Sequence, residues 1–164
     1  MAEEFELKTI RADGVDAAIR RAEHYRLLGQ PVQALSICHD VLAVDPDNQQ
    51  ALVVLVLAMT DQFEIGASSV NDAKERANQL TDEYQRRYYH GIIAERHARA
   101  LLTRGPSASF AYAGFREAME WFERAADVRS EGNDDPILRW NSCVRTIQDR
   151  GLRPRQPEAE VGLE

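Results

Sequence analysis

The sequence predicts an all-α protein assembled from antiparallel helical hairpins. Two short amphipathic patterns lie on either side of Gly29, and each repeats small and apolar residues at the three- and four-residue spacing of a helix face. These faces comprise Ala18, Ala22 and Tyr25 before the glycine and Ala34, Cys38 and Val41 after it. Both patterns return later in the chain, so we expect several similar hairpins.

The starts of the first pattern are spaced along the whole chain. The pattern returns from Leu52, Arg87 and Trp140, and successive starts are separated by 34, 35 and 53 residues. The second pattern returns from Ala73 and Ala118, which preserves the order of the two helices in each unit. We therefore expect three repeats and a closing helix, over about 16–48, 49–81, 82–130 and 135–150.

The first of these units resembles the tetratricopeptide repeat, a helix-turn-helix of 34 residues. The residues that match the family pattern are Tyr25, Ala34 and Pro46, and those that depart from it are Ala18, Arg21 and Cys38. The resemblance extends from about Asp16 to Gly151. It implies a short right-handed α-solenoid in which the first helices of successive repeats line a concave groove.

The helical domain is expected to span residues 14–151, after an acidic segment over residues 1–13. The helices of the first two hairpins are predicted over residues 16–28, 31–44, 48–62 and 69–80. The segment DPDN at 45–48 ends one hairpin and starts the next, because proline disfavours helix at the residue before it and Asn or Asp caps a first turn. A loop around residues 63–69 joins the helices of the second hairpin.

The third repeat has a longer first helix, followed by an insertion. The helix is predicted over 82–103, with Thr81 as its N-cap and two acids in its first turn, where the helix dipole favours them. The segment RGP at 104–106 ends it, and residues 107–115 are expected to form a loop or a helical extension. The aromatic side chains of this insertion either contact a partner or cover the end of the hairpin: Phe110, Tyr112 and Phe115.

The closing helix over 135–150 is predicted to begin at Asp135 and Pro136, as its N-cap and first residue. Such a helix caps the last apolar face of a repeat stack. Residues 152–164 contain two prolines, several charges and little apolar content, so we expect a flexible tail.

Composition and charge argue against several functional classes. A chain of 164 residues with 44% hydrophobic content can bury a core. Its longest apolar run, residues 51–59, is shorter than the roughly 20 residues that span a bilayer, so membrane insertion is not expected. A net charge of −7 argues against a nucleic-acid surface. The charged N-terminus is not typical of a signal peptide, which predicts a cytoplasmic location.

The long third-repeat helix carries a cluster of arginines: Arg86, Arg87, Arg96, Arg99 and Arg104. Guanidinium groups bind carboxylates well, so this helix could present a docking surface for an acidic partner. The other interpretation is a solvated helix face whose arginines pair with nearby Asp and Glu.

No catalytic residue, metal site or cofactor is predicted, because the sequence contains none of the common phosphate-loop, nucleophile or zinc-protease motifs. Cys38 and Cys143 are interpreted as small buried residues rather than as a disulfide. One alternative is a small ligand-binding domain or enzyme whose site lies between the insertion at 105–115 and a group of aromatic and histidine residues. These residues are Tyr88, Tyr89, His90 and His97.

The preferred interpretation is a non-catalytic adaptor, scaffold or assembly factor. Its concave groove would bind a peptide or amphipathic helix of another protein, with apolar side chains supplying affinity and charged ones fixing orientation. By position in the resembled family, the groove residues are Ile19, Glu23, Arg26, Val53, Leu57, Tyr88, Ile92 and Arg96. A third possibility is self-association, as a homo-oligomer or as a subunit of a larger complex.

Overall fold

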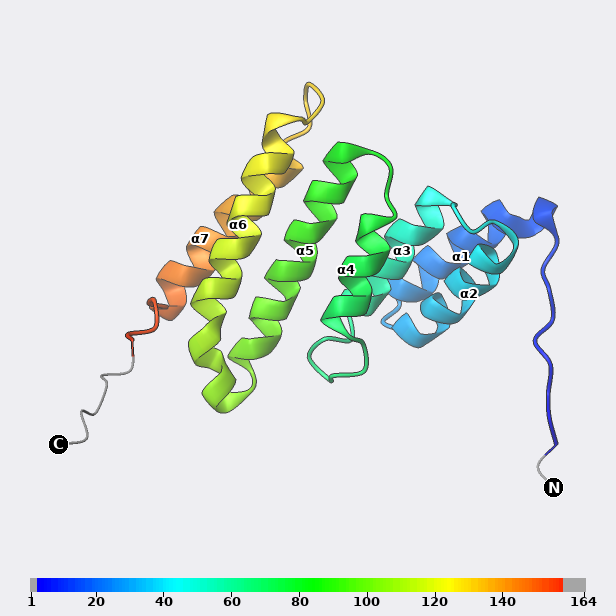
Figure 1. Ribbon diagram of the computed structural model, residues 1–164, viewed down its shortest axis with the longest axis horizontal. Helices are drawn as coiled ribbons and strands as arrows, with labels where there is room; N and C mark the ends of the chain where they lie inside the picture. The colour runs from blue at the N-terminus through cyan, green and yellow to red at the C-terminus, as the bar shows by residue number, and fades with distance from the viewer. Residues whose placement is uncertain (1–2, 158–164) are drawn as a thin grey trace.

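The computed structural model describes residues 3–157, and this part of the chain is all-α (Figure 1). Its α-helices are α1 (Val15–Leu27), α2 (Pro31–Val44), α3 (Gln49–Thr60), α4 (Val70–Asn78), α5 (Glu83–Leu102), α6 (Ala111–Asp127) and α7 (Asp135–Arg150). Two short 3-10 helices, η1 (Ala12–Gly14) and η2 (Gly105–Phe110), precede α1 and α6. The predicted all-α class is therefore confirmed for the described residues.

The helices are arranged as a row from α1 to α7 (Figure 1). Each helix packs against the next one in the sequence, and α3 also contacts both α1 and α5. Hydrogen bonds from Arg99 to Ser142 and Thr146 join α5 to α7. The odd-numbered helices therefore follow one another along one side of the molecule.

Local capping determines where several helices begin. The Asn48 side chain accepts a hydrogen bond from the Ala51 amide at 2.9 Å, as the DPDN segment predicted. The cap of α5 is Asp82 rather than Thr81, because the Asp82 carboxylate accepts from the Gln85 amide at 2.9 Å. Helix α7 also differs from the prediction by one residue, since Asp134 is its N-cap.

Helix α3 is buried by helices on both of its sides. Val54 and Leu55 belong to a core cluster shared with α1 and α2. Val56, the next residue, belongs to a second cluster shared with α4 and α5. This double burial accounts for the long apolar run in the sequence. Within residues 3–157, no helix combines the length and apolar character needed to cross a membrane.

The insertion predicted after Gly105 is helical, since η2 leads directly into α6 at Ala111. Phe115 is fully buried, because it shares the inner face of α6 with Ala118 and Phe122. Of the two alternatives for the insertion, a partner contact is therefore excluded for Phe115, whose side chain lies in the core.

The other two aromatic residues of the insertion remain closer to the surface. Tyr112 is partly buried, and Phe110 is exposed, with the Arg155 guanidinium over its ring at 4.1 Å. That contact, and the packing of Leu152 against the core, hold the first part of the predicted tail near the helices. Residues 158–164 of the tail lie outside the described residues.

Both cysteines are free and buried, one in each half of the molecule, as the sequence predicted. Burial raises the pKa of Cys38 to about 12, and burial together with the neighbouring Glu95 carboxylate raises the pKa of Cys143 to about 12. Both side chains therefore remain neutral and act as small apolar residues.

Helices α5 and α6 approach each other closely at two glycines. A Cβ atom at Gly91 in α5 would lie 2.5 Å from the Cε1 atom of Phe122 in α6. A Cβ atom at Gly114 in α6 would lie 2.9 Å from the Cβ atom of Ala98 in α5. Only glycine fits at this separation of the two helices, and the Phe122 ring fills the space above Gly91.

We expect Gly91→Ala to lower the free energy of unfolding by about 1–3 kcal/mol, because the buried Phe122 ring must move to admit one methyl group. Urea denaturation followed by circular dichroism measures this change. Gly14→Ala is the matched control, since a Cβ atom there meets nothing within 4 Å. Equal stability of the two variants would contradict the tight α5–α6 contact.

His90 lies in a buried environment between α4 and α6. Its Nε2 atom is 2.7 Å from the Asn78 Oδ1 atom, and its ring stacks on Trp121 with the ring centroids 4.8 Å apart. Burial, and secondarily the positive charges of Lys74 and Arg86, lower the pKa of His90 below its ordinary value of 6.5. The folded protein therefore holds this histidine neutral.

This environment predicts that stability decreases as the pH falls below about 6.5. The unfolded chain binds the His90 proton near the ordinary pKa while the folded chain resists it, so protonation favours unfolding. His90→Gln should reduce the loss of melting temperature between pH 7.5 and pH 5.5, measured by differential scanning calorimetry. His39→Gln changes an exposed histidine and should show the same drop in melting temperature as wild type. If His90→Gln also shows the wild-type drop, protonation of His90 does not cause the loss of stability.

Candidate functional site

A series of neighbouring hollows lies along α1, α3 and α5. The first has a volume of about 330 Å³ and is lined by Glu23, Arg26, Leu27, Val53, Val54, Leu57 and Tyr89. The second, of about 440 Å³, is lined by Arg26, Leu27, Gly29, Pro31, Asp61 and Arg96. The third, of about 150 Å³, is lined by Thr60, Asp61, Glu64, Arg96 and Arg99. Because neighbouring hollows share residues, we treat these three as one surface, the central groove.

Five of the eight residues that the sequence assigned to the groove line these hollows: Glu23, Arg26, Val53, Leu57 and Arg96. They come from α1, α3 and α5, the first helices of the predicted repeats. Spacings of three and four residues within α1 and α3 place each pair on one helix face.

Ile19 and Ile92 belong to the core instead. Each has only 2% of its surface exposed. Ile19 shares the inward stripe of α1 with Val15 and Ala22, and Ile92 packs in the cluster that contains Phe115. Their assignment to the groove surface is corrected, because neighbouring helices cover the faces that carry them.

The register of α5 also differs from the prediction by one residue. Tyr88 packs against the Phe122 ring, with the ring centroids 5.8 Å apart, whereas Tyr89 lines the first hollow. Burial raises the pKa of Tyr89 to about 12, so its hydroxyl stays neutral beside the apolar floor. A shift of one residue along a helix rotates the side-chain direction by about 100°, which is enough to move a side chain from the groove to the core.

Leu27 and Asp61 are among the groove residues that sequence reasoning missed. Leu27 ends α1 and is 80% exposed although it is apolar. Its position four residues after Glu23 and just before the turn at Gly29 was the available signal. Asp61 follows the last turn of α3, and no sequence feature indicates which helices it would reach.

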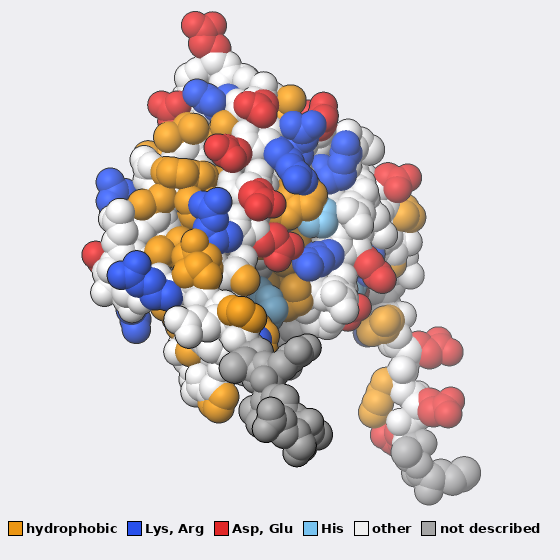
Figure 2. All heavy atoms as spheres, turned by 60° about the vertical axis from the view of Figure 1, so that its left-hand side comes forward, with side chains coloured by type: hydrophobic (Ala, Val, Ile, Leu, Met, Phe, Trp, Pro, Cys, Tyr) orange, Lys and Arg blue, Asp and Glu red, His pale blue; other side chains and the backbone are white. Residues whose placement is uncertain are grey.

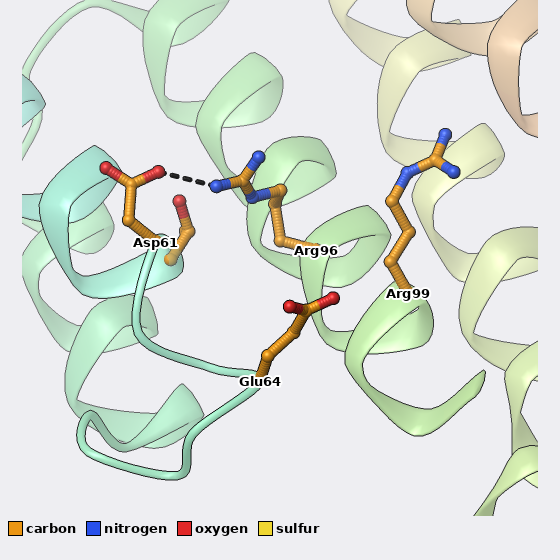
Figure 3. Close-up of a pocket in the computed structure, with 5 residues that line it drawn as sticks. Asp61, Glu64, Arg96 and Arg99 are labelled. Carbon is orange, nitrogen blue, oxygen red and sulfur yellow. Dashed lines mark hydrogen bonds and ion pairs between the residues drawn. The ribbon is translucent and has the colours of Figure 1, made fainter. Parts of the chain in front are cut away.

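Asp61 joins three helices through its carboxylate. Its Oδ2 atom lies 2.7 Å from Arg26 Nε, and its Oδ1 atom lies 2.5 Å from Arg96 Nη2. Figure 3 shows Arg96 reaching across the pocket to Asp61, with Glu64 and Arg99 on the same pocket. One negative charge is thus shared by two guanidinium groups, so this ion cluster carries one excess positive charge, while Glu64 also lines the pocket.

A second shared carboxylate, Glu95, lies in α5 and is fully buried. Arg99 donates to its Oε1 atom at 3.2 Å, Arg139 of α7 donates to its Oε2 atom at 3.1 Å, and the Cys143 thiol donates at 3.7 Å. The charges of the two arginines again exceed that of the carboxylate by one. Glu95 therefore fixes α7 against α5, and its partner Arg99 lines the third hollow.

Most of the arginine cluster of α5 has partners within the molecule. Arg87 pairs with Glu83, and Arg86 and Arg104 donate to the carbonyls of Leu80 and Phe63. Arg96 and Arg99 differ, since each pairs with a shared carboxylate and keeps about a third of its side chain exposed (35% for each). These two can therefore bind a further carboxylate in the groove.

The residues of the alternative ligand site point in different directions. Tyr89 lines the groove, whereas His90 contacts Asn78 and Trp121, and the His97 ring meets Phe63 with the ring centroids 6.5 Å apart. The first hollow, which Tyr89 lines, includes neither histidine. Among residues 3–157, no group of three His, Cys, Asp or Glu side chains could hold a metal ion.

We expect Glu95→Gln to lower the free energy of unfolding by about 1.5–3 kcal/mol, because charge-assisted hydrogen bonds to two arginines are lost inside the molecule. Chemical denaturation measures the change. Glu120→Gln, at an exposed position of α6, serves as the control and should stay within about 0.5 kcal/mol of wild type. If Glu95→Gln has the same free energy of unfolding as wild type, the bridge through Glu95 does not stabilise the fold.

The central groove combines an apolar floor at the α1–α3 end with arginines shared between carboxylates at the α5 end. Such a surface suits a ligand that carries both apolar and acidic groups. In comparisons with known proteins, no family model, no curated protein and no solved structure matches the chain.

Proposed function

We propose that the protein is a non-catalytic interaction module, an adaptor or assembly factor, that binds an acidic and apolar segment of another protein in the central groove. The observation that carries this proposal is the groove itself, where an apolar floor adjoins partly exposed arginines. Extended peptides and amphipathic helices both present apolar and acidic groups at regular spacing.

We further propose that the helices form a short right-handed solenoid of the tetratricopeptide type. The contacts of α3 with both α1 and α5, and the bonds from α5 to α7, support this arrangement. In such a stack the first helices of each hairpin provide a continuous surface, and the three hollows lie on these helices.

The two parts of the groove would contribute differently to binding. Burial of partner side chains against Leu27, Val53 and Leu57 would supply most of the affinity. Arg26 and Arg96 are already positioned by Asp61, so they lose little side-chain freedom when a partner carboxylate arrives. Their charges would fix the direction of the bound segment and increase its rate of association.

Selection from a display library of random short peptides tests this function directly, because it requires no identified partner. We expect the wild-type protein to enrich peptides in which acidic residues alternate with large apolar ones. Leu27→Glu/Val53→Glu should lose this enrichment, because two new carboxylates repel acidic peptides and interrupt the apolar floor. Titration of one enriched peptide, followed by fluorescence anisotropy, gives the loss of affinity.

The matched control is Leu138→Glu, which places a carboxylate on an exposed leucine of α7 that does not line the groove. It should bind the selected peptides as wild type does, and circular dichroism should show that all variants are folded. If the wild-type protein enriches no peptides, or if the double groove variant binds them unchanged, the groove is not the binding site.

A further inference from the structure

The N-terminal segment is the most exposed apolar part of the described chain. Residues 3–9 have no regular secondary structure and are exposed throughout. Phe5 is 88% exposed and Leu7 is 94% exposed, the two highest values among the large hydrophobic residues. Figure 1 shows this segment running away from the helices, and Figure 2 shows hydrophobic and acidic side chains along it. We refer to residues 3–10 as the N-terminal arm.

The arm ends at an anchored residue. Ile10 is partly buried and packs against the core cluster that α1 and α2 share. Beyond Ile10 the chain continues directly into η1 and α1. The base of the arm is therefore fixed to the body, while Phe5 and Leu7 stay in solvent.

The chemistry of the arm complements that of the central groove. In an extended segment alternate side chains point to opposite sides, so Phe5 and Leu7 lie on one side while Glu4 and Glu6 lie on the other. The two apolar side chains match the floor of the groove, and the two carboxylates match its arginines. A partner with this pattern is the kind of segment that the groove is proposed to bind.

The arm does not occupy the groove of its own molecule in this structure. None of residues 3–10 lines the three hollows, and Figure 1 shows the arm running away from the helices. Ile10 stays packed against the core that α1 and α2 share. The groove of a second copy can receive the arm without any change in this arrangement.

We propose that the N-terminal arm of one copy binds in the central groove of a second copy, with Phe5 and Leu7 on the apolar floor and Glu4 and Glu6 at Arg26 and Arg96. This inference rests on the proposed function, because it uses the same groove. It adds a regulatory consequence: self-association and partner binding compete for one surface. In copies joined in this way, the groove is free for a partner only after the partner has displaced the bound arm.

Analytical ultracentrifugation of the intact chain over a range of concentrations tests this proposal. The wild-type average mass should rise with concentration, whereas Phe5→Glu/Leu7→Glu should keep the mass of one copy. The arm lies outside the helices, so this variant should remain folded. The dissociation constant for self-association of this variant should be at least about tenfold higher than that of wild type, because two large apolar side chains are no longer buried between copies.

Mixing two defective variants provides the sharper test. The groove variant Leu27→Glu/Val53→Glu keeps an intact arm, and the arm variant keeps an intact groove. Each should stay a single copy when alone, whereas their equimolar mixture should form a complex of one copy of each. The control Leu138→Glu should associate as wild type does. A mixture that stays at the mass of one copy, or an arm variant that associates like wild type, would overturn the proposal.

A labelled peptide of residues 3–12 separates failure of this inference from failure of the proposed function. Binding of this peptide to the arm variant, and its loss in the groove variant, are the results expected. If peptides selected from the display library bind the groove but the arm peptide does not, the groove function stands and the arm proposal fails. If neither kind of peptide binds, both proposals fail.

Discussion

The close contact between α5 and α6 at Gly91 and Gly114 is the constraint on which the other elements depend. Because neither glycine has a Cβ atom, the two helices approach closely and the Phe122 ring packs directly over α5. This contact orients α5 so that Tyr89 and Arg96 face the groove. The same contact places the opposite face of α5, which carries Ile92, in the core. The shape of the groove thus follows from a packing contact on the other side of its helix.

Two shared carboxylates then connect the odd-numbered helices to each other. Asp61 links α1 to α5 through Arg26 and Arg96, and Glu95 links α5 to α7 through Arg139. A buried carboxylate is costly to desolvate, and pairing with two guanidinium groups offsets that cost. The same pairing leaves each ion cluster with one excess positive charge, so the contacts that hold the helices together also place partly exposed arginines in a groove that Glu23 and Glu64 line as well.

The partly exposed arginines are central to the proposed interactions. The acidic N-terminal arm and a segment of similar chemistry from another protein would be attracted to the same arginines, and only one of them can be seated at a time. An arm that is anchored at Ile10 and solvated beyond it has little structure to lose on binding. Such a segment is suited to reversible occupation of a groove, because a competing partner need not first unfold a packed element.

The sequence by itself determined the all-α class, the approximate positions of the helices and several of their ends, because helical periodicity, caps and proline breaks are local. The resemblance to the tetratricopeptide repeat, rather than periodicity, indicated Glu23, Arg26, Val53, Leu57 and Arg96 as groove residues. Tertiary structure alone decided which face of each helix its neighbours cover. Packing between distant segments therefore placed Ile19, Ile92 and Phe115 in the core. It also placed Tyr89 rather than Tyr88 in the groove. It brought Asp61 between two arginines that lie 35 residues from it on either side in the sequence.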